Sequence, residues 1–234
     1  MFDLLIKIPT RGRPDKFRNQ FDRYYTMLSG ELKVKFVVSM DADDSTMNND
    51  DMKWWLGPAN GHHNVFFYYG NSKSKVEAIN ADMHHHSDWK ILLLASDDMT
   101  PVQNGYDKII FNDMMRFYPD LNGALHYNDG RVGQRLITLS IMGKPMYDHF
   151  GYIYHPSYVS LYCDNEFHDS VYALNKAVYI DNVIIRHDWV NYTGKDPLHV
   201  RNESFYTTDG RTYERRRRSG FNPRLPYYLV KRAS

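Results

Sequence analysis

The sequence contains one cysteine, Cys163, in 234 residues. An intrachain disulfide and a cysteine-based zinc finger are therefore excluded. Long apolar runs are also missing, since none approaches the roughly 18 residues that a transmembrane helix needs. The amino-terminal residues lack the basic region, apolar region and cleavage site of a secretory signal. We therefore expect a cytoplasmic protein without a membrane span.

Two common nucleotide-binding motifs are absent as well. The sequence has no GxGxxG run and no GxxxxGK run followed by Ser or Thr, so dinucleotide-binding and P-loop assignments have no motif support. The net charge is only +1, which gives the whole chain no nucleic-acid signature and disfavours a non-enzymatic nucleic-acid binder. The charge is uneven, however, because Arg215-Arg216-Arg217-Arg218 forms a basic block.

The composition is that of an ordinary globular protein, with 42% hydrophobic and 24% charged residues, and the length suits one α/β domain. In the first half, apolar runs predict strands, and apolar residues at helical spacing predict helices. The predicted strands are residues 4–8, 32–40, 65–69 and 90–95, and the predicted helices are residues 14–29, 74–83 and 106–117. This alternation is typical of a mostly parallel, Rossmann-like sheet flanked by helices, so we expect an α/β fold.

The second half of the sequence is less regular. Residues 125–127, 137–141 and 178–185 are predicted strands, and no linker interrupts the chain before about residue 209. We expect a single domain over residues 1–208. Because glycines and prolines recur in the last part of the chain, residues 209–234 are predicted to form an irregular basic C-terminal tail.

Polar loops follow three of the predicted strands, at residues 10–13, 41–46 and 96–99. Ligands of such sheets bind beyond the carboxyl ends of the strands, so we expect the three loops to converge on one rim. Arg11 and Arg13 suit forked contacts with a phosphate or a base carbonyl. The loops thus combine one source of cations with two sources of carboxylates, which favours a nucleotide-sized site.

The strongest of these features is Ser96-Asp97-Asp98, where a buried strand ends in two adjacent carboxylates. Hard oxygen ligands at a strand end suit Mg²⁺ or Mn²⁺. Taken alone, such an acidic pair is also typical of an ordinary loop that caps the next helix or strand and binds no metal. The neighbouring polar loops favour a metal and diphosphate site here.

At this point the sequence resembles a known family. Residues 8–14 resemble the opening of GT-A-fold glycosyltransferases of the family 2 type, within the nucleotide-diphospho-sugar transferase superfamily. The loop at residues 41–46 is similar to their second acidic loop, although Ala42 and Asp44 interrupt its usual pattern. Ser96-Asp97-Asp98 resembles their DXD motif, and the resemblance spans roughly residues 4–190. It implies a GT-A-type fold and a glycosyltransferase activity.

The resemblance also implies roles for individual residues. Five of them would bind the nucleotide-sugar donor: Thr10, Arg11, Arg13, Asp41 and Asp97. The residues of the first loop would lie near the base and ribose, Asp41 would accept a hydrogen bond from the base, and Asp97 would face the ribose or the sugar. Asp98 would bind Mn²⁺ or Mg²⁺, whereas Ser96 is not expected to bind it.

Residues 162–167 resemble the acidic acceptor-site motif of the same family. A carboxylate here would take the proton from the acceptor hydroxyl as it attacks the anomeric carbon. Asp164 is the preferred base, with Glu166 as the close alternative. Asp164 is equally suited to be the N-cap of a helix with Glu166 in its first turn, and the two interpretations can coexist.

Two further cationic or ligating features lie closer to the C-terminus. His187 comes directly after an apolar strand, and by resemblance it could complete the metal or diphosphate site through a neutral ring nitrogen. Arg215 is the candidate residue of the basic C-terminal tail. In members of this fold such a segment often closes over the donor, and by resemblance Arg215 could bind the diphosphate. A solvated basic tail and a patch for a polyanionic acceptor remain open alternatives.

The resemblance therefore implies a metal-dependent transferase that moves a hexosyl or pentosyl group from a nucleotide diphosphate to a hydroxyl acceptor with inversion. The acceptor class is left open among glycans, small molecules and modified nucleic acid. A nucleotidyltransferase on a similar sheet is an alternative, but the first loop has only one glycine. A DNA-modifying, phage-type glycosyltransferase whose basic tail contacts DNA is another, and it predicts a steep salt dependence of binding.

Overall fold

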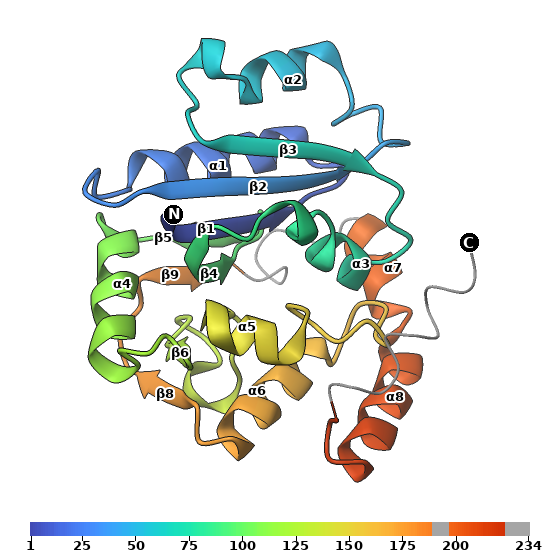
Figure 1. Cartoon of the computed structure of the whole chain (residues 1–234). Helices are drawn as coiled ribbons and strands as arrows, with labels where there is room; N and C mark the ends of the chain where they lie inside the picture. The colour runs from blue at the N-terminus through green and yellow to red at the C-terminus, as the bar shows by residue number, and fades with distance from the viewer. Residues whose placement is uncertain (189–196, 223–234) are drawn as a thin grey trace.

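The computed structural model describes residues 1–188 and 197–222. Its centre is a seven-stranded sheet (Figure 1). The strands of this sheet are β1 (Phe2–Pro9), β2 (Val34–Asp41), β3 (Val65–Gly70), β4 (Trp89–Leu94), β6 (Ala124–Tyr127), β7 (Ile141–Gly143) and β8 (Ala177–Ile180). Their order across the sheet is β3-β2-β1-β4-β7-β6-β8. Two short strands, β5 (Met99–Pro101) and β9 (Ile185–His187), pair with each other in a separate antiparallel ribbon.

The pairing of the sheet is mostly parallel, as predicted. β1 runs parallel to β2 on one side and to β4 on the other, and β2 runs parallel to β3. Only β7 runs against its neighbours β4 and β6 among the described pairs. The four N-terminal strands therefore end on the same edge of the sheet, which is where a ligand site is expected.

Helices cover both faces of the sheet. The helices are α1 (Pro14–Thr26), α2 (Asp50–Leu56), α3 (Lys75–Asn80), α4 (Tyr106–Phe117), α5 (Lys144–Phe150), α6 (Cys163–Ala173), α7 (Pro197–Glu203) and α8 (Tyr206–Arg218), with 3₁₀ turns at η1 (Pro58–Asn60), η2 (Met83–His85) and η3 (Gly133–Arg135). Alternate residues of β1 face opposite layers. Leu4 and Ile6 pack in one core with α1 and α4, whereas Leu5 packs in the other with α3, α5 and α6. None of the helices in the described part of the chain is long and apolar enough to span a bilayer.

The helix predicted over residues 74–83 is shorter in the structure. Ser74 is its N-cap, and its side chain accepts a hydrogen bond from the backbone N–H of Glu77. The helix ends at Asn80, because Ala81 leaves the helical region and Asp82 takes a positive φ of 65°. Met83 then begins a separate 3₁₀ turn and still reaches the core.

Two of the predicted strands in the second half are wrong in extent. The strand predicted at residues 137–141 begins only at Ile141. Before it, the backbone N–H of Ile137 donates to the His168 ring at 3.2 Å instead of to a neighbouring strand, and the Thr138 side chain donates to Asp129 at 2.8 Å. The strand predicted at residues 178–185 is split between β8 and β9. Between the two strands, the Asn182 side chain accepts a hydrogen bond from the Gln103 amide at 2.7 Å.

The predicted irregular tail is also wrong over its first part, since α8 runs through the expected boundary between residues 208 and 209. Tertiary contacts hold this helix. The buried Asp209 carboxylate accepts the backbone N–H groups of residues 159–161 at 2.7–3.0 Å. Arg216 forms a forked pair with Glu166 of α6 at 2.6 and 2.7 Å. Residues 223–234 of the predicted tail lie outside the described residues.

We expect Arg216→Ala to lower the free energy of unfolding by about 3–5 kcal/mol, because the variant leaves the Glu166 carboxylate buried without its partner. Arg217→Ala is the matched control. Arg217 is exposed, its contact with Glu214 is 3.2 Å long, and its loss should cost under about 1 kcal/mol. Urea denaturation followed by circular dichroism measures both values, and equal losses would contradict the anchoring role of Arg216.

Candidate active site

A cavity opens at the edge of the sheet where β1, β2 and β4 end. Its walls come from the three loops that were predicted to converge, together with residues of α3, α6, α7 and β9. The predicted site residues that line it are Thr10, Arg11, Arg13, Asp41, Asp97, Asp98, Asp164 and His187. The structure thus brings eight of the ten predicted residues to one cavity.

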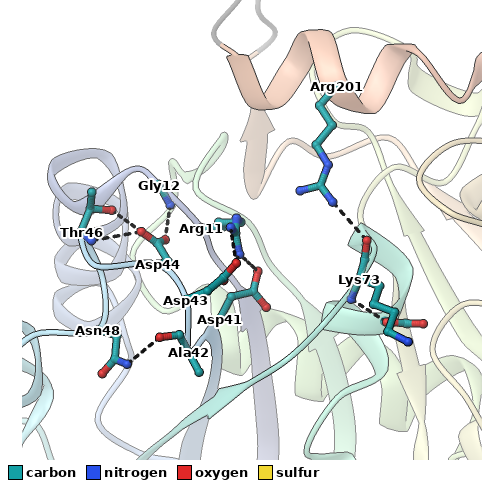
Figure 2. A network of polar contacts seen from close by, with 11 residues as sticks. Arg11, Gly12, Asp41, Ala42, Asp43, Asp44, Thr46, Asn48, Lys73 and Arg201 are labelled. Atoms are coloured by element: carbon teal, nitrogen blue, oxygen red, sulfur yellow. Dashed lines mark hydrogen bonds and ion pairs between the residues drawn. The ribbon is translucent and has the colours of Figure 1, made fainter. Parts of the chain in front are cut away.

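Arg11 links the first loop to the second. Its Nη1 lies 2.7 Å from Asp41 and 2.6 Å from Asp43, so one guanidinium lies between two carboxylates (Figure 2). The hydrogen bonds to Asp43 and Asp41 raise the pKa of Arg11, and the same contact with Arg11 lowers the pKa of Asp43. Asp41 is therefore buried at the end of β2 with a cation as its partner.

Asp44, which interrupts the family's usual loop pattern, has a structural task. Its Oδ2 accepts the backbone N–H of Gly12 at 2.6 Å, and its Oδ1 accepts the hydroxyl of Thr46 at 2.6 Å (Figure 2). Gly12 has a φ of 68°, a conformation that costs glycine little. Asp44 therefore ties the first loop to the second and fixes the position of the neighbouring Arg11.

Arg13 performs a similar task for the third loop. Its Nη1 lies 2.8 Å from Oδ1 of Asp97, and Lys16 is 4.0 Å from the same oxygen. Burial raises the pKa of Asp97, and the charge of Arg13 offsets part of that effect. Beside this pair, the buried Oγ1 of Thr10 has no hydrogen-bond partner among the described residues. A buried hydroxyl without a partner at a cavity wall is available to a ligand.

Asp98 and His187 lie next to each other in the wall of the cavity. Oδ2 of Asp98 lies 3.8 Å from Nε2 of His187, and Nδ1 of His187 lies 3.8 Å from Asp129. Burial alone would lower the pKa of His187, but the two carboxylates raise it to about 9. Burial alone would raise the pKa of Asp98, but its contacts with His187 and Ser96 hold it well below its ordinary value.

The ribbon of β5 and β9 creates this arrangement. Met99 pairs with His187, and the backbone N–H of Asp188 donates to the Asp98 carbonyl at 2.7 Å. Asp129, which contacts His187, could not be recognised from the sequence, because Asn128-Asp129-Gly130 is an ordinary turn sequence. Its carboxylate is held by backbone N–H groups at 2.8–3.2 Å and by Thr138 at 2.8 Å.

The donor atoms at this point fit a dication that is shared with a ligand. Asp98 offers a carboxylate oxygen, and His187 offers a ring nitrogen once a metal displaces the proton that the two carboxylates favour there; both residues line the cavity. Within residues 1–188 and 197–222, no group of three or more His, Cys, Asp or Glu side chains forms a complete metal site. Mg²⁺ commonly takes one or two protein ligands and completes its shell with water and substrate phosphates. Two protein ligands therefore suit a metal bound together with a diphosphate.

The two candidate bases lie in different surroundings. Asp164 lines the cavity in the first turn of α6, and the N-cap of that helix is Tyr162 rather than Asp164. Glu166 is 4% exposed and points away to Arg216, while the hydroxyl of Tyr158 donates to it at 2.7 Å. The structure therefore brings Asp164, and not Glu166, to the cavity.

The C-terminal cation that lines the cavity is not the predicted Arg215. Arg215 is exposed on α8 and lines a separate hollow. Arg201 of α7 lines the cavity instead, and its Nη2 donates to the Lys73 carbonyl at 3.1 Å (Figure 2). Lys75 at the start of α3 also lines it and makes no hydrogen bond or ion pair within the described part of the chain. Its charge contributes to the low pKa of Asp98.

No protein-family model matches the chain, and no curated protein matches its sequence. Solved structures do match its fold. A mannosyltransferase from Pyrobaculum calidifontis, PcManGT, solved with GDP-Man and Mn²⁺, has a TM-score of 0.58 and 13% identity over 80% of this chain and 59% of its own. TarS from S. aureus (residues 1–349), solved with UDP, has a TM-score of 0.57 and 13% identity over 79% of this chain and 60% of its own.

GalNAc-T7, solved with UDP, GalNAc and Mn²⁺, has a TM-score of 0.63 and 8% identity over 80% of this chain. The chain spans about 60% of the first two structures and 43% of GalNAc-T7. At such low identity these likenesses establish the fold alone. That fold is the GT-A fold, a mostly parallel α/β sheet flanked by helices.

Proposed function

We propose that the protein is a metal-dependent glycosyltransferase, which moves a sugar from a nucleotide diphosphate to an acceptor hydroxyl with inversion. The observation that carries this proposal is the meeting of Asp41, Asp97, Asp98, Asp164 and His187 at one cavity of a GT-A fold. Structures with this fold were solved with GDP-Man and Mn²⁺, with UDP, and with UDP, GalNAc and Mn²⁺. These ligands support a nucleotide-sugar donor for this chain.

The first two loops would hold the nucleoside. Arg11 and Arg13 present guanidinium donors, and Asp41 presents a carboxylate whose Oδ2 is already bound by Arg11. A base N–H would use the remaining oxygen of Asp41. The unpartnered hydroxyl of Thr10 adds one more polar contact. Because Arg11 and Arg13 are fixed by their carboxylate partners before any ligand arrives, the pocket loses little conformational entropy on binding.

The diphosphate would lie against Asp98 and His187, which would hold the dication. When bound, a dication offsets the charge of the diphosphate and improves it as a leaving group. Lys75 and Arg201 stand at the same cavity and can neutralise the diphosphate from the side of α3 and α7. Asp97, held by Arg13, would face the ribose or the sugar.

Asp164 would be the general base. The acceptor oxygen attacks the anomeric carbon, the bond from that carbon to the phosphate oxygen breaks, and the nucleoside diphosphate leaves. The hydroxyl proton passes to the Asp164 carboxylate. We assign this role to Asp164 rather than Glu166, because Glu166 already bonds with Arg216 and Tyr158 and does not line the cavity.

A thermal-shift panel of nucleotide sugars with and without Mn²⁺ tests the donor class. A donor at about 100 times its Kd should stabilise the chain by about 2.7 kcal/mol, which corresponds to a rise in Tm of about 5–10 °C. We expect such a rise for one nucleotide sugar and only in the presence of the metal. If every nucleotide sugar leaves the Tm unchanged, the proposed function is wrong.

Asp98→Asn should remove the metal-dependent thermal shift and lower the transfer rate by about 100-fold or more, because it takes a negative charge from the metal position. The variant keeps the shape of the side chain, so the fold should survive. Asp148→Asn, at an exposed carboxylate of α5, is the matched control and should change neither value. Unaltered metal dependence in Asp98→Asn would rule out this ligand.

Asp164→Asn should lower the transfer rate by about 10²–10⁴-fold while the donor-induced thermal shift stays, because the base acts on the acceptor and not on the donor. Glu166→Gln should instead lower the free energy of unfolding with little effect on the rate of the folded enzyme. Single-turnover transfer and urea denaturation separate the two effects. A loss of rate in Glu166→Gln, with normal rates in Asp164→Asn, would reverse the assignment.

A further inference from the structure

A second hollow lies on α8, outside the cavity described above. Tyr162, Tyr206, Tyr213, Arg211, Arg215 and Arg218 line it, and we call these six residues the α8 surface. Figure 1 shows α8 at the end of the molecule opposite α2, below α7. The proposed reaction uses none of these residues.

The arginines of the α8 surface are unbalanced positive charges. Arg211, Arg215 and Arg218 follow each other at helical spacings of four and three residues, so they share one face of α8. All three are exposed, and none makes a hydrogen bond or ion pair with a described residue. The one acidic residue of this hollow, Glu214, is paired with Arg217 at 3.2 Å. Because like charges at these spacings repel, the face favours a polyanion over solvent.

Tyrosine rings lie beside these charges. The ring centroid of Tyr162 is 5.3 Å from that of Tyr206 and 5.7 Å from that of Tyr213. Tyr206 is 62% exposed, so its ring is open to a further stacking partner. The Tyr162 ring lies over Gly210, where an added Cβ would stand 3.4 Å from it. A small residue in α8 thus lets this ring lie close to the helix.

The α8 surface and the proposed acceptor side of the cavity both include residues at the start of α6. Tyr162 is the N-cap of α6, and Cys163 and Asp164, which come next in the chain, line the cavity. The buried contacts of Asp209 and Arg216 hold α8 against the α6 region. A polymer bound along α8 therefore meets a surface that buried contacts hold against α6.

We propose that the α8 surface binds a single-stranded nucleic acid. The three arginines contact successive phosphates, and Tyr206 stacks on a base. Positive charge that follows the backbone, combined with exposed aromatic rings, is the combination that binds single strands with little sequence preference. This inference goes beyond the proposed transfer reaction, since strand binding requires neither a donor nor a metal.

Fluorescence anisotropy of a labelled, mixed-sequence DNA oligonucleotide tests the proposal with the full chain. We expect binding that weakens as salt rises from about 50 to 200 mM. Arg211→Ala, Arg215→Ala and Arg218→Ala combined should reduce the slope of log K against log salt by about 2, since each phosphate contact on a single strand contributes about 0.7. Tyr206→Ala should weaken binding by about tenfold and leave the slope unchanged.

The matched control removes three exposed cations elsewhere, through Lys33→Ala, Lys53→Ala and Arg116→Ala combined. This variant should bind the oligonucleotide with the slope of the unaltered chain. The proposal is overturned if the oligonucleotide does not bind at low salt, or if the two triple variants lose affinity equally. Binding of heparin without binding of the oligonucleotide would make the hollow a polysaccharide site and would also overturn it. None of these outcomes depends on sugar transfer, so failure here and failure of the proposed function remain distinguishable.

Discussion

The close approach of carboxylates at one edge of the sheet is the constraint on which the site depends. Parallel pairing of β1 with β2 and with β4 brings the ends of three strands together, and two of those strands continue into acidic residues. Carboxylates gathered in this way raise one another's pKa and repel. Arg11 and Arg13, both from the loop after β1, oppose that repulsion: Arg11 contacts Asp41 and Asp43, and Arg13 contacts Asp97. The cationic loop therefore lets two acidic loops share one cavity before any ligand binds.

This part of the site could be predicted from the sequence because it follows from local patterns and one rule of topology. Each strand of the first half is an apolar run, and parallel strands must end on the same edge. The β5–β9 ribbon is different. Nothing in residues 128–130 indicates that Asp129 lies beside His187, because the two residues are far apart in the chain and meet through a tertiary contact, in which the backbone N–H of His187 donates to the Asp129 carbonyl at 3.0 Å. The resemblance pointed to His187, but only tertiary structure brings its second carboxylate into place.

The acidic pair in α6 shows where sequence reasoning stops. Asp164 and Glu166 are two residues apart, and a rotation of about 200° along a helix sends them to opposite sides. Which of them faces the cavity depends on Arg216, 50 residues further along the chain. The same contact explains why residues 209–218 are helical despite their glycine: packing of Asp209 and Arg216 outweighs a weak local propensity.

The C-terminal helices connect the two sides of the cavity. Arg201 of α7 bonds to the Lys73 carbonyl in the loop before α3, on the side proposed for the donor. The next helix, α8, begins three residues after α7 ends. Its Asp209 accepts a backbone hydrogen bond from the segment before α6, and its Arg216 pairs with Glu166 of α6. The sheet sets the positions of the carboxylates that follow β2 and β4, and the contacts of α7 and α8 join the side proposed for the donor to the side proposed for the acceptor.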